Sequence, residues 1–227
     1  MSNIVCKGLV KTFQQGDQTI YGLNHVSLTI KQGEMTVLSG PSGSGKTTLL
    51  NAIGGLDEPD SGTVYVGDVE ITGLTKSQRA DVRLQRIGFV FQAYNLIPVL
   101  TVRENIEFVM QLQGVAATER QKRCQEILAE VGLTGLESRR PAQLSGGQQQ
   151  RVAVARAIVS KPVLILADEP TANLDSKTSA QLLELFTQLN RQHGITFLIA
   201  THDAQVFDYC RRHIYMVDGK IVTDTRS

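Results

Sequence analysis

The residues with the clearest chemistry form a glycine-rich run in the first quarter of the chain. The run matches the phosphate-loop pattern of glycine, four residues, glycine, lysine and serine or threonine, and consists of Gly40, Pro41, Ser42, Gly43, Ser44, Gly45, Lys46 and Thr47. Its glycines let backbone N–H groups approach phosphate oxygens, and the helix expected at residues 47–53 adds its positive N-terminal end. Lys46 would supply a charge to the outer phosphates, and the Thr47 hydroxyl would coordinate Mg²⁺. An apolar strand expected at Met35–Ser39 precedes the run, so a phosphate loop is favoured over an ordinary turn.

A pair of carboxylates follows a second apolar run. Residues 163–167 are apolar throughout and end in Asp168 and Glu169. Such a run suits a strand buried on both faces of a parallel sheet, and ligands bind at the carboxyl ends of such strands. Asp168 would hold Mg²⁺ directly or through water, and Glu169 would orient or polarise the attacking water. The alternative, a polar turn that closes a core strand, is disfavoured by the phosphate loop in the same chain.

From about Ile4 to Val222 the chain resembles the ATP-binding subunits of ABC transporters. Four further motifs carry this resemblance, in the family's order. The Q-loop glutamine falls on Gln92, and the signature falls on Leu144, Ser145, Gly146, Gly147 and Gln148. The D-loop falls on Ala172, Asn173, Leu174 and Asp175, and the switch histidine falls on His202. The resemblance implies an α/β fold, with a P-loop NTPase core of the ABC-ATPase type, an antiparallel β subdomain and an inserted α-helical subdomain.

The same resemblance implies an ATPase with ATP and Mg²⁺ as cofactors. Glu169 and His202 would be catalytic, and Thr47, Gln92 and Asp168 would bind Mg²⁺. The ATP site would comprise Phe13, Gly40, Pro41, Ser42, Gly43, Ser44, Gly45, Lys46, Thr47, Thr48, Gln92, Ser145, Gly146, Gly147, Gln148 and Asp175. Phe13 stands where the family usually has a tyrosine that stacks on adenine, and Tyr21 is the rival candidate.

The signature precedes a helix expected at residues 149–159, so its amides and the helix dipole would form a second anion site. One chain cannot easily place both anion sites on the same phosphate. In the family, the signature of one subunit closes on the phosphate loop of the other, which implies a homodimer with two nucleotides between the subunits. Ser145 and Gln148 also form a capping-box pattern, and the cap can be part of the site.

Composition agrees with a single, well-packed unit. The 227 residues are 41% hydrophobic, and 23 basic and 22 acidic side chains leave a formal charge of +1. The basic residues are scattered along the sequence, so nucleic acid is not an expected partner, and pairs such as Arg211 and Arg212 are expected on solvated faces. Cys6, Cys124 and Cys210 lack metal-ligand spacing and are expected to be reduced thiols.

The organisation expected is one ATP-binding domain, residues 1–227. The core and the β subdomain would occupy about 1–91 and 161–227, and the helical subdomain about 92–160. Residues 4–39 and 62–71 would be mostly antiparallel strands, whereas the strands near Phe89, residues 163–167 and Thr196–Ala200 would form a parallel core. Helices are expected after the Thr101 and Glu104 capping box, at residues 118–131 and at residues 176–192.

The resemblance to ABC transporters also implies a membrane partner. No signal peptide or stretch long enough to span a bilayer is evident, so the chain is expected at the cytoplasmic face of the inner membrane, held by a separate permease. The apolar segment from Tyr94 to Leu100 would dock that permease, although Leu96 and Leu100 could instead pack the helical subdomain. A periplasmic adaptor would be a further partner reached through the permease.

Connecting residues such as Asn95, Leu96, Ile97 and Pro98 most resemble the macrolide-export and lipoprotein-release branch, so the transporter is expected to be an exporter or a mechanically coupled system. Two alternatives stay open. One is a regulatory scaffold similar to the cell-division member of the family. The other is a DNA-maintenance ABC ATPase, which the short interval without heptads or cysteine pairs between Gln92 and Leu144 disfavours.

Overall fold

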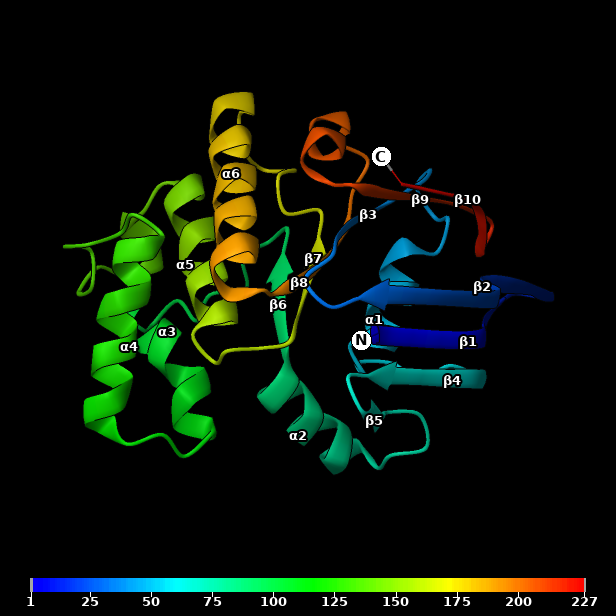
Figure 1. Ribbon diagram of the computed structural model, residues 1–227, viewed down its shortest axis with the longest axis horizontal. Helices are drawn as coiled ribbons and strands as arrows, with labels where there is room; N and C mark the ends of the chain where they lie inside the picture. The colour runs from blue at the N-terminus through cyan, green and yellow to red at the C-terminus, as the bar shows by residue number, and fades with distance from the viewer. Residues whose placement is uncertain (1, 227) are drawn as a thin grey trace.

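The computed structural model describes residues 2–226, so the first and last residues of the expected 1–227 unit lie outside the described residues. Two sheets organise the chain (Figure 1). The antiparallel sheet has the order β2-β1-β4-β5, formed by Gln18–Lys31, Ser2–Gln15, Ser61–Val66 and Val69–Glu70. The larger sheet has the order β10-β9-β3-β8-β7-β6, formed by Lys220–Arg226, Arg212–Val217, Met35–Ser39, Thr196–Ala200, Leu164–Asp168 and Ile87–Phe91.

The larger sheet separates two hydrophobic cores. Strands β9, β3, β8, β7 and β6 run parallel and β10 is antiparallel to β9. Successive residues of a strand point to opposite faces. Leu164 and Leu166 of β7 therefore pack with α1 (Lys46–Ile53) and the antiparallel sheet, whereas Ile165 and Ala167 pack with α5 (Gly146–Ile158) and α6 (Ser176–His193). Because both faces are covered, these strands read as continuous apolar runs.

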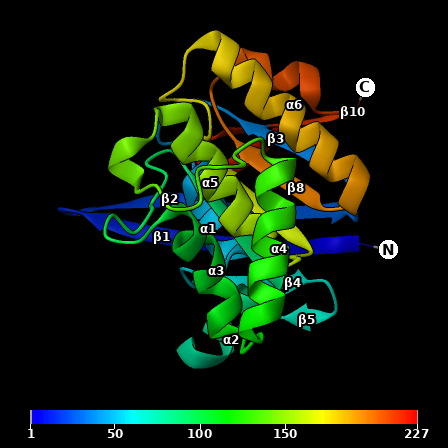
Figure 2. The same ribbon diagram turned by 90° about the vertical axis from the view of Figure 1, so that its left-hand side faces the viewer.

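The helices α3 (Val102–Leu112), α4 (Ala117–Glu130) and α5 gather at one end of the molecule, on the left of Figure 1 and nearest the viewer in Figure 2. The predicted capping box is present at the start of α3, where Thr101 accepts from the Glu104 backbone and Glu104 accepts from the Thr101 backbone. Ile127 and Leu128 are buried as their helical spacing predicts. In α6, the apolar residues that recur at helical spacing are buried: Leu182, Leu183, Leu185, Phe186 and Leu189.

Several parts of the fold differ from the expectations or went unpredicted. Within residues 4–39, β1 and β2 are antiparallel as expected, but β3 pairs in parallel with both β8 and β9. The strands β9 and β10, the helix α2 (Lys76–Arg86) and two short 3-10 helices, η1 (Pro141–Gln143) and η2 (Ala204–Tyr209), were not predicted. None of the helices within residues 2–226 has the length and apolarity that crossing a membrane requires.

The expectation that Arg211 and Arg212 both lie on a solvated face was wrong for Arg212. Its side chain is buried, with Nε and Nη2 donating to the Asp224 carboxylate at 2.8 and 2.7 Å and Nη1 donating to the Thr29 carbonyl at 2.6 Å. These ion-pair contacts raise the pKa of Arg212 and lower that of Asp224. The missed partner lies on β10, which the sequence pattern had not indicated.

Candidate functional site

The glycine-rich run forms a tight loop between β3 and α1. Gly40 and Gly45 have φ angles of 148° and 100°, a region that residues with side chains rarely adopt. A Cβ on Gly40 would lie 2.1 Å from the Met216 carbonyl oxygen, and one on Gly45 would lie 2.2 Å from the Gly22 carbonyl oxygen. Both positions therefore require glycine, for conformation and for space.

Donor groups converge inside this loop. The Lys46 side chain is buried, and its Nζ donates to the carbonyl oxygens of Gly40 and Pro41 at 2.9 and 3.0 Å. The Ser44 hydroxyl is also buried, without a hydrogen-bond partner within residues 2–226. An ammonium group, an uncommitted hydroxyl and the first turn of α1 together fit an anion such as a phosphate.

Asp168 ends β7 beside the first turn of α1. Its Oδ2 and Oδ1 accept from the Thr47 hydroxyl at 3.0 and 3.3 Å. Burial raises the pKa of Asp168 above its usual value, Glu169 raises it further, and Thr47 and Lys46 oppose the rise. Burial therefore makes the ionised carboxylate costly, and a cation bound between it and the Thr47 hydroxyl would offset that cost. This donor set fits Mg²⁺, which takes oxygen ligands and usually keeps several waters or phosphate oxygens besides.

Glu169 contacts Thr201 and His202, whereas the preceding residue, Asp168, contacts Thr47. Its φ angle of 47° is uncommon for a residue with a side chain, and its backbone N–H donates to the Ala200 carbonyl at 2.8 Å. The carboxylate accepts from the Thr201 hydroxyl at 2.9 Å, and its other oxygen lies 2.9 Å from Nδ1 of His202. The His202 side chain is 74% exposed. This left-handed turn directs the two consecutive carboxylates to different partners.

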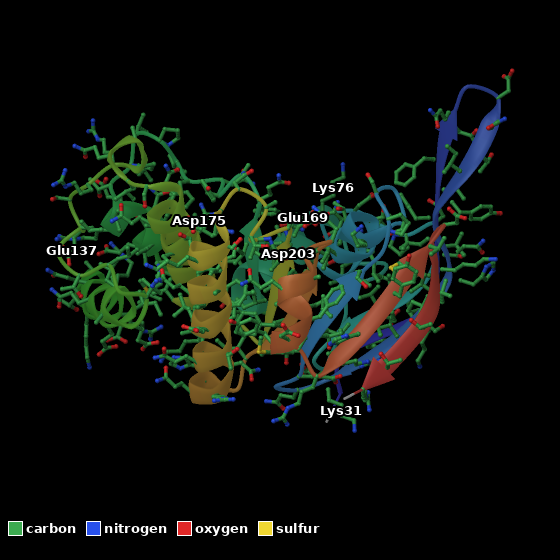
Figure 3. The ribbon with its side chains drawn as sticks, turned by 90° about the horizontal axis from the view of Figure 1, so that it is seen from above. Lys31, Lys76, Glu137, Glu169, Asp175 and Asp203 are labelled. Atoms are coloured by element: carbon green, nitrogen blue, oxygen red, sulfur yellow. The ribbon has the colours of Figure 1, made fainter. Side chains whose placement is uncertain are left out.

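Thr201 and Asp203 were missed by the sequence reasoning. Besides donating to Glu169, the Thr201 hydroxyl accepts from the Asp203 backbone N–H at 3.0 Å. The Asp203 carboxylate accepts from the Thr171 hydroxyl at 2.8 Å, and Figure 3 shows Glu169 and Asp203 close together at the centre of the molecule. The only feature of the sequence that could have indicated Thr201 and Asp203 is that they flank His202, directly after a buried strand.

A pocket beside the phosphate loop contains both aromatic candidates. Phe13 and Tyr21 line it together with Ile20, Gly22 and residues 43–48, so Thr48 lies there too. Phe13 and Tyr21 are 46% and 45% exposed, so part of each side chain is open to solvent. The Phe13 ring covers Gly22, where an added Cβ would lie 2.5 Å from Phe13 Cε2. Phe13 and Tyr21 therefore both remain candidates for stacking on adenine.

The signature begins α5, as its capping-box pattern predicts. The Ser145 hydroxyl accepts from the Gln148 N–H at 3.3 Å, and Gln148 Oε1 accepts from the Ser145 N–H at 2.9 Å. A Cβ on Gly147 would lie 2.5 Å from Thr178 Cγ2, and one on Gly146 would lie 2.9 Å from the Tyr94 hydroxyl. Since α5 and α1 pack on opposite faces of the larger sheet (Figure 1), one chain does not bring the signature onto its own phosphate loop.

Two further predicted site residues have local roles within the chain. Gln92 follows β6, whose Phe91 is in register with Asp168, and its carbonyl accepts from Asn173 Nδ2 at 2.9 Å. The Asp175 carboxylate caps α6 by accepting from the backbone N–H groups of residues 177 and 178 at 3.1 and 3.0 Å. Both residues are exposed.

The segment expected to dock a partner is held in an unusual conformation. Tyr94 and Asn95 have φ angles of 60° and 50°, and Arg156 of α5 donates to the carbonyl oxygens of both residues, at 3.0 and 2.5 Å. Burial lowers the pKa of Arg156. Leu96 packs against the core, as the alternative reading expected for it, whereas Val99 is 72% exposed.

Comparison with known proteins identifies the family. The sequence pattern of the family described as ABC transporter matches residues 23–172. The chain belongs to the ABC transporter family. Within it, this ABC transporter ATP-binding domain is similar to an uncharacterized ABC transporter ATP-binding protein, MJ0796, from Methanocaldococcus jannaschii, with 45% identity over 96% of this chain and 94% of that protein. A solved dimeric structure of MJ0796 in a post-hydrolysis state, bound to ADP and Pi, has a TM-score of 0.91 and 42% identity over 98% of both chains.

Two other relatives agree with the branch that the connecting residues indicated. The lipoprotein-releasing system ATP-binding protein LolD of Anaeromyxobacter dehalogenans is 46% identical over 96% of this ABC transporter domain and 91% of its own length. The macrolide export ATP-binding/permease protein MacB of Marinobacter nauticus is 43% identical over 98% of this chain but only 34% of its own length. The predicted fold class and the predicted resemblance are both confirmed, and the chain is an ABC-type ATPase.

Proposed function

We propose that two copies of this chain bind two molecules of Mg²⁺-ATP between them and that hydrolysis, aided by Glu169 and His202, drives a separate membrane permease. The observation that carries this proposal is the divergence of two consecutive carboxylates. Asp168 contacts Thr47 of the phosphate loop, whereas Glu169 is held by Thr201 and His202. This divergence supports a role for Asp168 at the nucleotide's cation and a separate role for Glu169 at the attacking water.

The nucleotide would lie along the phosphate loop, with its base against Phe13 or Tyr21. Lys46 would contact the outer phosphates, and the Ser44 hydroxyl would find an acceptor there. Thr47 and Asp168 would hold Mg²⁺, with Gln92 reaching it from the end of β6. When bound, the cation neutralises charge that develops on the phosphate oxygens. Glu169 would accept a proton from the water, and His202 would keep the carboxylate oriented toward that water.

The second half of each site would come from the other copy. Gly146 and Gly147 present amides at the start of α5, beside the cap formed by Ser145 and Gln148 and on the opposite face of the sheet from α1. A two-fold arrangement would place these groups and Asp175 on the partner's nucleotide. The dimeric structures of MJ0796, which match this chain over 98% of its length, support such an assembly.

The membrane partner would contact the segment from Tyr94 to Leu100. We assign about residues 92–160 to a helical subdomain that carries this segment, and about 1–91 and 161–227 to the core and β subdomain. The names of the relatives LolD and MacB support an exporter or a mechanically coupled system. Under this proposal the chain lies at the cytoplasmic face of the inner membrane, with a periplasmic adaptor reached through the permease.

Replacement of Glu169 by glutamine tests the catalytic assignment. Glu169→Gln keeps the shape of the side chain but removes its ability to accept a proton, so we expect turnover to fall about 100-fold or more while ATP affinity changes little. Steady-state phosphate release and equilibrium ATP binding measure the two effects. Gln181→Glu, a change in charge on the exposed side of α6, is the control and should leave both unchanged. Turnover in Glu169→Gln within about twofold of the unchanged chain would rule out the assigned role.

A further inference from the structure

A cleft opens at the amino ends of the parallel strands, at the end of the sheet opposite to Asp168 and Glu169. Its walls are the turn between β2 and β3, the last turn of α6, the end of η2 and the start of β9. Figure 3 shows Lys31, one of its lining residues, at the edge of the molecule across from Glu169. The volume of about 600 Å³ lies within the range of small-molecule sites, and the cleft shares no residue with the pocket at the phosphate loop.

This amino-end cleft concentrates positive charge. Five basic side chains and one carboxylate line it: Lys31, Arg191, Arg211, Arg212, Arg226 and Glu34. The chain as a whole is nearly balanced, with 23 basic and 22 acidic residues. The basic residues come from four separate places in the sequence, at 31, 191, 211–212 and 226, and the fold brings them together. A concave surface lined by one sign of charge attracts ligands of the opposite sign.

The single lining carboxylate is already engaged. Glu34 Oε1 lies 3.2 Å from Arg212 Nη1, and Oε2 accepts from the Lys31 backbone N–H at 2.9 Å. The rest of the Arg212 guanidinium is satisfied by Asp224. Within the described part of the chain, no carboxylate pairs with the side chains of Lys31 or Arg191. Arg191 lies in the last turn of α6, where the helix dipole favours a cation, and its side chain lines the cleft.

The wall beneath these cations is rigid. Asn190 Nδ2 donates to the carbonyl oxygens of Gly33 and Ile195 at 2.9 and 2.7 Å, which ties the turn between β2 and β3 to α6. The Gly33 N–H donates to the Thr196 hydroxyl at 2.9 Å. Because the turn is fixed before any ligand arrives, binding would cost little ordering of the backbone.

We propose that the amino-end cleft binds an anion that carries two or more phosphate groups. Lys31, Arg191 and Arg211 would contact the phosphates, and Tyr209 would lie beside the rest of the ligand. Arginine favours phosphate because its planar guanidinium donates two parallel hydrogen bonds to neighbouring oxygens. Several cations around one cleft favour a multivalent anion over a single phosphate. Free polyphosphate and nucleotides share this chemistry, and the site is independent of the ATP site.

The test uses sodium tripolyphosphate and isothermal titration calorimetry without magnesium. Lys46→Ala first weakens binding at the phosphate loop, and in that background the cleft is altered by Lys31→Glu with Arg191→Glu. We expect the affinity for tripolyphosphate to fall about tenfold or more, because two attractive charges become repulsive. Lys76→Glu with Lys122→Glu, two exposed lysines outside the cleft, should leave the affinity unchanged. Equal affinity in the cleft variant and the control would overturn the proposal.

A second pair of changes keeps the result interpretable if charge reversal disturbs folding. Lys31→Gln with Arg191→Gln removes both charges without repulsion and should weaken binding by a smaller factor. Tyr209→Leu separates the two ligand sources, since weaker binding of ADP but not of tripolyphosphate assigns a nucleotide, and equal effects assign free polyphosphate. If neither probe binds to the Lys46→Ala chain, the site does not exist.

Discussion

At the scale of single residues, the site depends on how one strand end separates two adjacent carboxylates. Asp168 continues β7 and reaches Thr47, whereas Glu169 adopts a left-handed conformation and turns toward β8. The Glu169 N–H donates to the Ala200 carbonyl, so a backbone hydrogen bond supports this uncommon conformation. Thr201 and His202 then fix the carboxylate. Under the proposed mechanism, Thr201 would therefore affect turnover through Glu169.

Thr201→Val tests this positioning role. Valine matches threonine in shape but cannot donate to Glu169 or accept from the Asp203 N–H. We expect turnover to fall about tenfold, because a misaligned base is less effective, while ATP affinity stays unchanged. The free energy of unfolding should also fall by about 1–3 kcal/mol, since the partly buried Asp203 N–H loses its acceptor. Thr201→Ser, which keeps the hydroxyl, should restore most of the turnover, and a Ser variant as slow as the Val variant would argue against the hydrogen bond.

The ionised Asp168 side chain should lower the free energy of unfolding, by an amount that depends on pH. Its pKa is raised in the folded chain, chiefly by burial. The folded chain therefore binds this proton more tightly than the unfolded chain, and the free energy of unfolding decreases as pH rises from about 4 through the raised pKa. Asp168→Asn cannot ionise, so without Mg²⁺ it should melt at a higher temperature than the unchanged chain at pH 7. Thermal unfolding at pH 7 and near pH 4 checks this, because the difference should shrink at the lower pH.

At the scale of elements, α5 connects three features of the site. Ser145 and the signature begin it, and Gly147 allows close packing against Thr178 of α6. Near its other end, Arg156 holds the carbonyl oxygens of Tyr94 and Asn95. A shift of α5 would therefore move the signature and the docking segment together. This connection gives a physical route from a membrane partner to the nucleotide.

The docking segment can be tested with two substitutions. Tyr94→Asp with Ile97→Asp places charge on the proposed contact surface, so stimulation of ATPase activity by the permease should be lost while the activity of the isolated chain stays within about twofold. Phosphate release with and without the permease in detergent measures both. Val222→Asp, which places the same charge on a more exposed apolar residue of β10, should leave stimulation intact. Unchanged stimulation in the double variant would exclude the segment as the docking site.

At the scale of the whole molecule, the sequence predicted the parts whose signal is local and missed the parts that depend on distant partners. The runs at Met35–Ser39 and Thr196–Ala200 and the capping box at Thr101 are confirmed, because apolar continuity and cap chemistry are local. Arg212 was misjudged because its partner Asp224 lies on the unpredicted β10.

The same division applies to the site and to the amino-end cleft. The place of Asp168 beside Thr47 could be predicted from a motif and a strand end, since both lie at the carboxyl edge of one sheet. The support of Glu169 by Thr201 needed the register of β7 with β8. The basic residues of the cleft are scattered between positions 31 and 226, so no window of sequence could show their convergence.

The most direct test of the central claim, that each nucleotide site is built from two copies, mixes two inactive variants. Lys46→Ala disables the phosphate loop, and Ser145→Arg disables the signature by bulk and charge. Homodimers of either variant have two broken sites, but a mixed dimer has one intact site, in which the loop of one copy faces the signature of the other. We predict that each variant alone hydrolyses almost no ATP and that an equimolar mixture recovers up to about a quarter of the normal rate. A mixture as inactive as its components would contradict a site shared between two copies.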